Sequence, residues 1–250
     1  MRTLVNRLVR KLFQNDRAAM AGLPDENQVL IREIREKKLT YLSASKLASI
    51  VNVCLDIEER KLEGAFVEAG CALGGSTILI SKTKTLKRLF KVYDVFTMIP
   101  PPTENDGEDV KKRYKKIKEG NSRGIGGDKY YGYEDDLLKR VLENLASFGV
   151  TEEQHNVRII KGLLQDTMQI DQPIAFAHID VDWYDPVMAC LERITPQLVL
   201  GGSIILDDYN DWSGCRKATD QYFRDKLIDF RMNDSAGSMK ITRVSTKLFA

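Results

Sequence analysis

From Ala65 onward, short apolar runs of strand character alternate with segments of helical periodicity. Seven apolar runs fit strands, namely Ala65–Glu68, Leu89–Tyr93, Val157–Ile160, Ile174–Ile179, Ser203–Leu206, Ile228–Met232 and Met239–Val244. Alternation of this kind predicts an α/β protein in which helices cover both faces of a mostly parallel sheet. The last two runs enclose the turn residues Asn233, Asp234 and Gly237, so they predict a terminal β-hairpin.

The predicted helices divide the chain into an N-terminal helical extension over residues 1–62 and an α/β domain over residues 63–250. The extension includes a helix over Leu42–Glu58, for which Ser43 or Ser45 can serve as N-cap. The domain contains a helix that follows a glycine turn and ends near Lys82, and further helices over Tyr133–Phe148, Pro186–Gln197 and Gly214–Phe223.

At the N-terminus, apolar pairs alternate with basic residues between Met1 and Phe13. The charges interrupt the apolar positions at every turn, so this segment is not a signal peptide. The spacing places the apolar residues on one helical stripe, which packs either on the domain itself or on a second subunit; a helix lying on a membrane surface is the alternative.

A long connection between Pro100 and Gly132 interrupts the alternation. It opens with three prolines, continues with mixed charge and ends with several glycines. Because it follows the second predicted strand, it should lie above the carboxyl ends of the strands, where α/β proteins bind ligands. We therefore expect this insertion to be a functional lid over a bound ligand, with a floppy insertion as the alternative. Its basic run, residues 111–116, is flanked by acidic residues and indicates a solvated helix face, with an anionic ligand as the alternative.

Composition narrows the class of protein. The 250 residues are 43% hydrophobic and 30% charged with a net charge of +2, which indicates a folded chain and gives no indication of nucleic-acid binding. No apolar run approaches the ~20 residues that span a bilayer. The four cysteines, Cys54, Cys71, Cys190 and Cys215, form no CxxC pair or zinc pattern. We expect buried, reduced thiols and a cytoplasmic location.

The strand at Ala65 leads into a glycine turn that contains Gly70 and Gly74. Glycines there permit a tight turn and close approach of a ligand to the backbone. Glu68 ends the strand, and its carboxylate would repel a pyrophosphate but attract an amine, which favours S-adenosylmethionine (SAM) over a dinucleotide. Asp94 ends the next strand, 24 residues beyond Gly70, in the position of a ribose-binding carboxylate.

Carboxylates also follow two later strands. Asp180 and Asp182 come after Ile174–Ile179, and Asp207 and Asp208 follow the next strand, 27 residues beyond Asp180. Strands joined by one crossover are often adjacent, so Asp180, Asp207 and Asp208 should converge. Their repulsion requires a cation, and oxygen ligands alone suit Mg²⁺ or another divalent ion. His178, on the same predicted strand, is expected to be a core residue, with a base or ligand role as the alternative.

After the third predicted strand, Lys161 to Thr167 carries a polar pair, Gln165 and Asp166, that could meet the adenine of a nucleoside. Several segments together resemble the macrocin O-methyltransferase family: Thr40–Ser43, Phe66–Cys71 with Gly74–Ser76, Gly162–Thr167, Asp180 with Asp182, and Gly201–Tyr209. The resemblance extends from Thr40 to Phe223, and the segment from Thr103 to Tyr131 has no counterpart that we can place.

The resemblance implies a Rossmann-like class I methyltransferase fold, whose seven-stranded sheet is mostly parallel with an antiparallel last strand. It further implies metal-dependent methyl transfer from SAM to a sugar hydroxyl of a natural product or polysaccharide. Site roles follow for SAM contact (Tyr41, Glu68, Gly70, Gly74, Ser76, Asp94, Gln165, Asp166), metal binding (Asp180, Asp207, Asp208) and catalysis (Asp180, and Asp182 as general base).

Two alternatives remain at this stage. A nicotinamide-dependent oxidoreductase has the same sheet topology, but its turn needs a middle glycine where this chain has Ala72. A catalytically silent binding protein would have no reason to keep the repelling aspartates. We expect a small-molecule acceptor, contacted by Tyr130, Tyr131 and Tyr133, and a homodimer.

Overall fold

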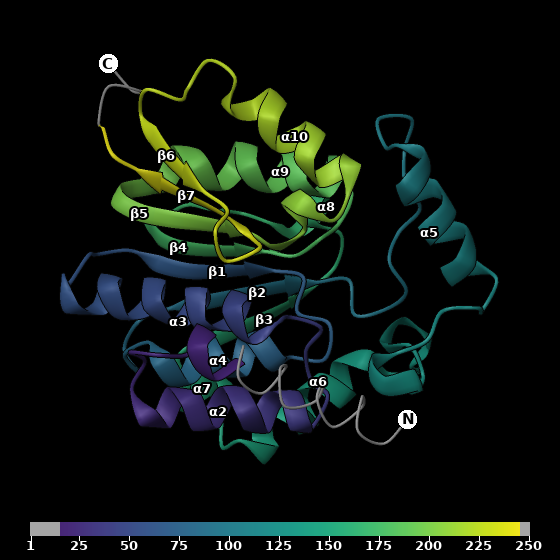
Figure 1. Cartoon of the computed structure of the whole chain (residues 1–250), viewed down its shortest axis with the longest axis horizontal. Coiled ribbons are helices and arrows are strands. Elements are labelled where there is room, and N and C mark those ends of the chain that lie inside the picture. Colours follow the sequence, from purple (N-terminus) through teal and green to yellow (C-terminus); the bar gives the residue numbers. More distant parts are fainter. Residues whose placement is uncertain (1–15, 246–250) are drawn as a thin grey trace.

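The computed structural model describes residues 16–245, and the stripe predicted over residues 1–13 lies outside this range. Its centre is a seven-stranded sheet with the order β3-β2-β1-β4-β5-β7-β6. The strands are β1 (Ala65–Ala69), β2 (Phe90–Asp94), β3 (Val157–Lys161), β4 (Ile174–Ile179), β5 (Leu198–Leu206), β6 (Phe230–Asn233) and β7 (Met239–Arg243). All seven predicted strands are therefore present (Figure 1).

The sheet is parallel from β3 through β5, and β7 runs antiparallel to both of its neighbours, β5 and β6. The predicted fold class and the terminal hairpin are thus confirmed. β4 and β5 are adjacent, as expected for strands joined by one crossover. The strand order reverses between β1 and β4, and parallel sheets bind ligands at such a switch point.

Helices cover both faces of the sheet (Figure 1). Alternating side chains of each strand point to opposite faces, so Phe66 packs with the first helical layer and Val67 with the second. One layer contains α2 (Asp25–Glu36), α3 (Ala44–Glu59), α4 (Gly75–Thr83), α6 (Leu137–Ser147) and α7 (Glu152–His155). The other contains α8 (Leu164–Thr167), α9 (Tyr184–Ile194) and α10 (Ser213–Phe223).

Several boundaries differ from those predicted. α6 begins at Leu137 rather than Tyr133, because the carboxylate of Asp136 caps the helix by accepting from the backbone N–H of Lys139. The segment Tyr131–Tyr133 forms a separate 3₁₀ turn. β5 begins at Leu198, five residues before the predicted start at Ser203, and α9 ends at Ile194 in another 3₁₀ turn.

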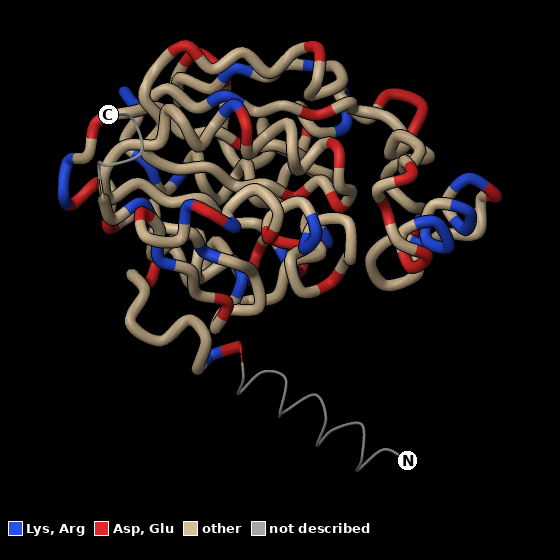
Figure 2. The backbone as a smooth tube through the Cα atoms, turned by 90° about the horizontal axis from the view of Figure 1, so that it is seen from above, with Lys and Arg blue, Asp and Glu red and all other residues tan. Residues whose placement is uncertain are grey.

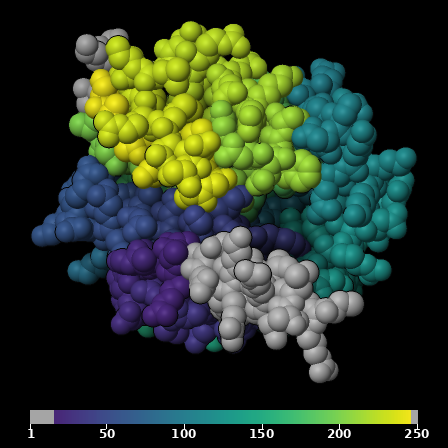
Figure 3. All heavy atoms as spheres, in the orientation of Figure 1, coloured from purple at the N-terminus to yellow at the C-terminus, as the bar shows by residue number. Residues whose placement is uncertain are grey.

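The insertion between Pro100 and Gly132 is folded. It contains α5 (Glu108–Lys118) and the 3₁₀ turn Ile125–Gly127, and it lies beside α9 and α10 (Figures 1 and 3). Two residues of α5, Val110 and Ile117, are buried. Closure of this segment as a lid stays a prediction.

Side chains of the insertion bind the start of α9 and of α10. The buried carboxylate of Asp106 accepts hydrogen bonds from the backbone N–H of Tyr184 at 2.8 Å and of Thr103 at 2.9 Å. The indole of Trp183 donates to the carbonyl of Pro100 at 3.0 Å. The insertion is therefore fixed to the segment that connects β4 to α9.

Two expectations from composition can be compared with the structure. All four cysteines are buried and free of disulfides. Across residues 16–245, we find no helix whose length and hydropathy would allow it to cross a membrane.

The Asp106 anchor can be tested by Asp106→Ala. The variant leaves the buried N–H of Tyr184 and the N–H of Thr103 without their acceptor, so the free energy of unfolding in urea should fall by about 1–3 kcal/mol. Limited proteolysis should then cut faster between residues 100 and 132. Glu104→Ala removes an exposed acidic residue from the same loop and is the matched control. Equal cleavage of both variants and the parent protein would contradict the assignment.

Candidate functional site

A cavity of about 870 Å³ opens at the carboxyl ends of β1, β2, β4 and β5, at the point where the strand order reverses. Its lining combines the turn after β1, the end of β2, the loops after β4 and β5, the start of α3 and the insertion. Cavities at this position of α/β sheets are the usual ligand sites.

The turn after β1 packs too closely against its neighbours for any side chain at Gly70. A Cβ on Gly70, whose φ is +81°, would lie 1.9 Å from the backbone oxygen of Asp180. The Gly70 N–H donates to the carbonyl of Tyr93, and the N–H of Cys71 donates to the Asp94 carboxylate at 2.8 Å. The turn is thus held between the ends of β2 and β4.

Glu68 lies beneath this turn and has no exposed surface. One carboxylate oxygen is 2.9 Å from Nδ1 of His178, and the other accepts a hydrogen bond from the hydroxyl of Thr77 in α4. Burial lowers the pKa of His178, but the hydrogen bond and charge of Glu68 raise it more, and the result is above the ordinary value. Within residues 16–245, Nε2 of His178 has no hydrogen-bond partner.

The other predicted SAM residues are divided between the cavity wall and its surroundings. Tyr41, Gly70, Asp94 and Gln165 line the cavity. Glu68, Gly74 and Ser76 are absent from the lining, and Ser76 is buried in the first turn of α4. Asp166 is exposed and lies outside the lining. The structure therefore brings four of the eight predicted residues to one surface.

The loops after β4 and β5 bring the predicted aspartates together. One carboxylate oxygen from each of Asp180, Asp207 and Asp208 lies within 4.8 Å of the other two. Burial and the charge of Asp207 raise the pKa of Asp180 to about 8. Burial and the charges of Asp182 and Asp180 raise the pKa of Asp208 well above its ordinary value. Burial is the larger cause of these pKa shifts, and the repulsion between aspartates that the sequence predicted adds to it.

Asp182 stands beside this cluster with strained backbone geometry. Its φ of +57° is unusual for a residue with a side chain, and its N–H donates to the carboxylate of Asp208 at 3.1 Å. Burial raises the pKa of Asp182 to about 6, although the charge of Arg113 opposes the shift. The loop thereby points a carboxylate into the cavity next to the triplet.

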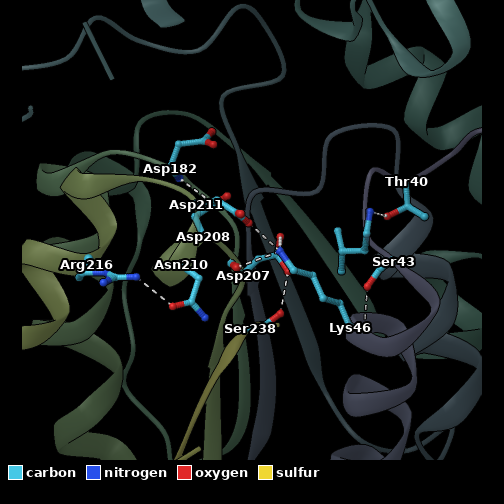
Figure 4. Close-up of polar contacts among 11 residues, drawn as sticks. Thr40, Ser43, Lys46, Asp182, Asp207, Asp208, Asn210, Asp211, Arg216 and Ser238 are labelled. Carbon is cyan, nitrogen blue, oxygen red and sulfur yellow. Dashed lines mark hydrogen bonds and ion pairs between the residues drawn. The ribbon is translucent and has the colours of Figure 1, made fainter. Parts of the chain in front are cut away.

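The structure adds Lys46, which the sequence analysis did not identify. Its ammonium, at the first turn of α3, lies 3.0 Å from one carboxylate oxygen of Asp207 and 2.9 Å from Asp211 (Figure 4). The hydroxyl of Ser238 donates to the other oxygen of Asp207 at 2.9 Å. The only sequence signal is a lysine near the start of an otherwise apolar helix, and no spacing rule links it to residue 207.

The triplet suits a divalent cation. All of its donors are carboxylate oxygens, which suits a hard ion such as Mg²⁺, and a bound cation would relieve the repulsion that raises the pKa values of Asp180 and Asp208. Lys46 and Ser238 hold the carboxylate of Asp207 in place from two elements.

Aromatic side chains form the rest of the cavity wall. From the extension and the insertion come Tyr41, Tyr130 and Tyr131, with ring centroids 5.9 Å apart for Tyr41 and Tyr131. Trp183 and Trp212 lie on the side of α9 and α10, with centroids 5.9 Å apart. Of the three tyrosines predicted to touch an acceptor, Tyr133 is absent from the lining.

Comparison with known proteins gives one family match. The model of the macrocin O-methyltransferase (TylF) family matches residues 25–237. Mycinamicin III 3''-O-methyltransferase of Micromonospora griseorubida is 26% identical over 233 residues, which cover 88% of this chain and 86% of that protein. Demethyldecarbamoylnovobiocin O-methyltransferase of Streptomyces niveus is 24% identical over 192 residues, or 73% of this chain and 67% of that protein.

Solved structures show the same fold. The structure of the O-methyltransferase NovP matches with a TM-score of 0.69 and 22% identity, and the match covers 83% of each chain. The calicheamicin methyltransferase CalS11 matches with a TM-score of 0.62 and 16% identity over 95% of this chain and 93% of that one. The class I methyltransferase fold is thereby confirmed.

The buried Glu68–His178 pair can be tested by Glu68→Gln. Removing one charge from a buried pair should lower the free energy of unfolding by about 3–5 kcal/mol, measured in urea. Thr77→Val removes only the hydrogen bond to the same carboxylate, so a loss of about 1 kcal/mol is expected. Equal stability of Glu68→Gln and the parent protein would show that the pair does not stabilise the fold.

The carboxylate cluster should make stability depend on pH. The folded protein holds the protons of Asp180 and Asp182 more tightly than the unfolded chain does, because their pKa values rise from 3.8 to about 8 and about 6. Their stabilising contribution is thus present at low pH and lost as the pH rises through 6 to 8. In chelator, Tm should fall between pH 6 and pH 8.5.

Added Mg²⁺ or Mn²⁺ competes with these protons, so it should raise Tm more at pH 8.5 than at pH 6. Asp207→Asn should reduce this increase, whereas Asp171→Asn, at an exposed carboxylate whose partner is Lys91, should leave it unchanged. An increase that is larger at pH 6 would rule out the carboxylates as the ligands.

Proposed function

The chain belongs to the macrocin O-methyltransferase (TylF) family and is a SAM-dependent O-methyltransferase, and from this premise we propose that it methylates a sugar hydroxyl with the help of a divalent cation. The observation that carries the proposal is the arrangement of the cavity. The glycine turn after β1 and the carboxylate triplet after β4 and β5 face one space, so the residues that would hold a methyl donor and those that would hold a divalent cation border the same acceptor position.

Family membership decides between the earlier alternatives. It favours a methyltransferase over both a nicotinamide-dependent oxidoreductase and a catalytically silent binding protein. The turn is consistent with this conclusion, because Ala72, with φ of +47°, occupies the position of the middle glycine in a dinucleotide turn.

We place SAM over the turn at Gly70, with its ribose toward Asp94 and its adenine toward Gln165. All three residues line the cavity, and Tyr41 lies on the same wall. Glu68 does not reach this surface, and its bond to Thr77 supports a role in holding the first turn of α4 under the cofactor. Gly74, Ser76 and Asp166 stay predicted cofactor residues.

Asp180, Asp207 and Asp208 are the proposed metal ligands. Asp180 is also proposed as a catalytic residue, because the cation that it would hold acts on the acceptor hydroxyl. A bound divalent cation lowers the pKa of an acceptor hydroxyl, as it does for water. Lys46 and Ser238 orient Asp207, and the aspartates fix where the acceptor oxygen must lie relative to the methyl donor.

Asp182 is the proposed general base. It lines the cavity beside the triplet, and its pKa of about 6 leaves it ionised yet basic enough to accept a proton near neutral pH. The strained turn at Asp182 and its N–H bond to Asp208 hold the carboxylate at this place.

We propose a sugar as the acceptor from two observations. One relative, from Streptomyces olivaceus, is a 4'-O-methyltransferase of a tetracenomycin C derivative whose name includes a rhamnosyl group. The wall formed by Tyr41, Tyr131 and Trp183 offers aromatic faces, which pack against the C–H surfaces of sugars. A glycosylated natural product or a polysaccharide precursor fits these features. A homodimer and a cytoplasmic location stay predictions.

The proposal predicts that methyl transfer requires a divalent metal and Asp182. With labelled SAM and a panel of glycosides, EDTA should abolish transfer and Mg²⁺ should restore it. Asp207→Asn should weaken binding of Mn²⁺, which reports directly on the site, while the circular dichroism spectrum stays unchanged. Asp182→Asn should lower kcat by about 10²–10⁴-fold, the range for loss of a general base, and retain SAM binding.

Asp211→Asn is the matched control for these variants, because Asp211 contacts Lys46 at the same edge but lies outside the triplet. Its effect on Mn²⁺ binding should be smaller than that of Asp207→Asn. Full turnover in excess chelator would refute the role of the metal, and an unchanged kcat in Asp182→Asn would refute the role of the base.

A further inference from the structure

One residue of the basic run in the insertion differs from its neighbours. Lys111, Lys112, Lys115 and Lys116 are exposed along α5, whereas Arg113 is partly buried and lines the cavity (Figure 2 shows the basic residues along this helix). Ile117, one turn further on, lines the cavity as well. The same helix thus presents its lysines to solvent and one guanidinium to the site.

The guanidinium of Arg113 is held in place. It donates to the hydroxyl of Ser122 at 2.9 Å and lies over the ring of Tyr130, 5.6 Å from the centroid. Ser122 is itself buried, and its N–H donates to the hydroxyl of Tyr133 at 3.2 Å. The insertion therefore prepares this cation for binding, and little side-chain entropy remains to be lost.

Arg113 forms no salt bridge in the part of the chain that the structure describes, although its charge interacts with that of Asp182. Throughout residues 16–245, no carboxylate oxygen lies within 4.0 Å of its guanidinium nitrogens, and Ser122 is its only hydrogen-bond acceptor. A guanidinium has five N–H donors in a planar fork that matches a carboxylate or a phosphate. Lys46, the other cation in the lining, is already paired with Asp207 and Asp211.

We propose that Arg113 binds an oxyanion of the acceptor, a carboxylate or a phosphate, and so makes the enzyme selective for acidic sugar derivatives. This inference rests on the proposed function and names the acceptor class for the same site. Two parallel N–H bonds from the free side of the fork would supply affinity and direction.

The charges of the lining also fix the orientation of such an acceptor. The lining contains eight carboxylates, Asp94, Asp106, Asp180, Asp182, Asp185, Asp207, Asp208 and Asp211. Those that are neither proposed metal ligands nor paired with Lys46, such as Asp94 and Asp182, would repel an anion, which favours Arg113 as the place for it. With the anion at the insertion, the uncharged hydroxyl end of the acceptor is directed toward Asp180 and Asp182.

The test compares three probes on the protein loaded with S-adenosylhomocysteine and Mg²⁺. Methyl glucuronoside carries a carboxylate, uridine diphosphate glucose carries a phosphate group, and methyl glucoside is the neutral reference. By calorimetry, at least one acidic probe should bind about tenfold to a hundredfold more tightly than methyl glucoside, as for a charge-assisted hydrogen bond. The preferred probe identifies the oxyanion.

Arg113→Gln should reduce this preference at least tenfold, Arg113→Lys should retain part of it, and Lys112→Gln, on the exposed face of α5, should retain all of it. Binding of S-adenosylhomocysteine and Tm verify that each variant is folded. The proposal is overturned if neither acidic probe is preferred, or if the preference survives Arg113→Gln. Methyl transfer is measured separately, so a preference without turnover would count against the proposed reaction alone.

Discussion

Repulsion among carboxylates is the constraint on which the site depends. The sheet places Asp180, Asp207 and Asp208 within 4.8 Å of one another, and burial raises the cost of their charges. Two positive groups of different kinds can offset this repulsion. Lys46 is built into the chain and pairs with Asp207, while a divalent cation is the group that the remaining oxygens are suited to receive. In the proposed metal site, this repulsion would be a source of affinity for the ion.

The order of the strands explains why the turn proposed to bind SAM lies close to the carboxylates proposed to bind the metal. β1 and β4 are neighbours from which the sheet extends in opposite directions, so the loops that follow them diverge and leave a cavity between them. At its base the two loops touch, since only a hydrogen at Gly70 fits against the backbone of Asp180. That contact sets the spacing between the turn proposed for SAM and the carboxylates proposed for the acceptor, and a side chain at Gly70 would separate them.

Strand positions, the mostly parallel sheet and the convergence of the aspartates could be predicted because they follow from local periodicity and from rules on crossovers. Contacts made by tertiary packing could not. Glu68 lies one residue before the end of β1, and its carboxylate is bound by His178, whose side chain faces it from the adjacent strand. Lys46 reaches a carboxylate 161 residues away, and no sequence pattern encodes that distance. Arg113 lies in a run of lysines, and only the orientation of α5 distinguishes it from them.

The insertion is coupled to the chemistry through hydrogen bonds rather than through the sheet. Asp106 binds the N–H of Tyr184, two residues beyond Asp182, and the indole of Trp183 binds the carbonyl of Pro100. The strained turn that carries the proposed base is therefore fixed on one side by β4 and on the other by the insertion. Arg113 lies on α5, in the same insertion whose Asp106 holds the start of α9 beside Asp182. The proposed acceptor contact and the placement of the proposed base therefore depend on one folded segment.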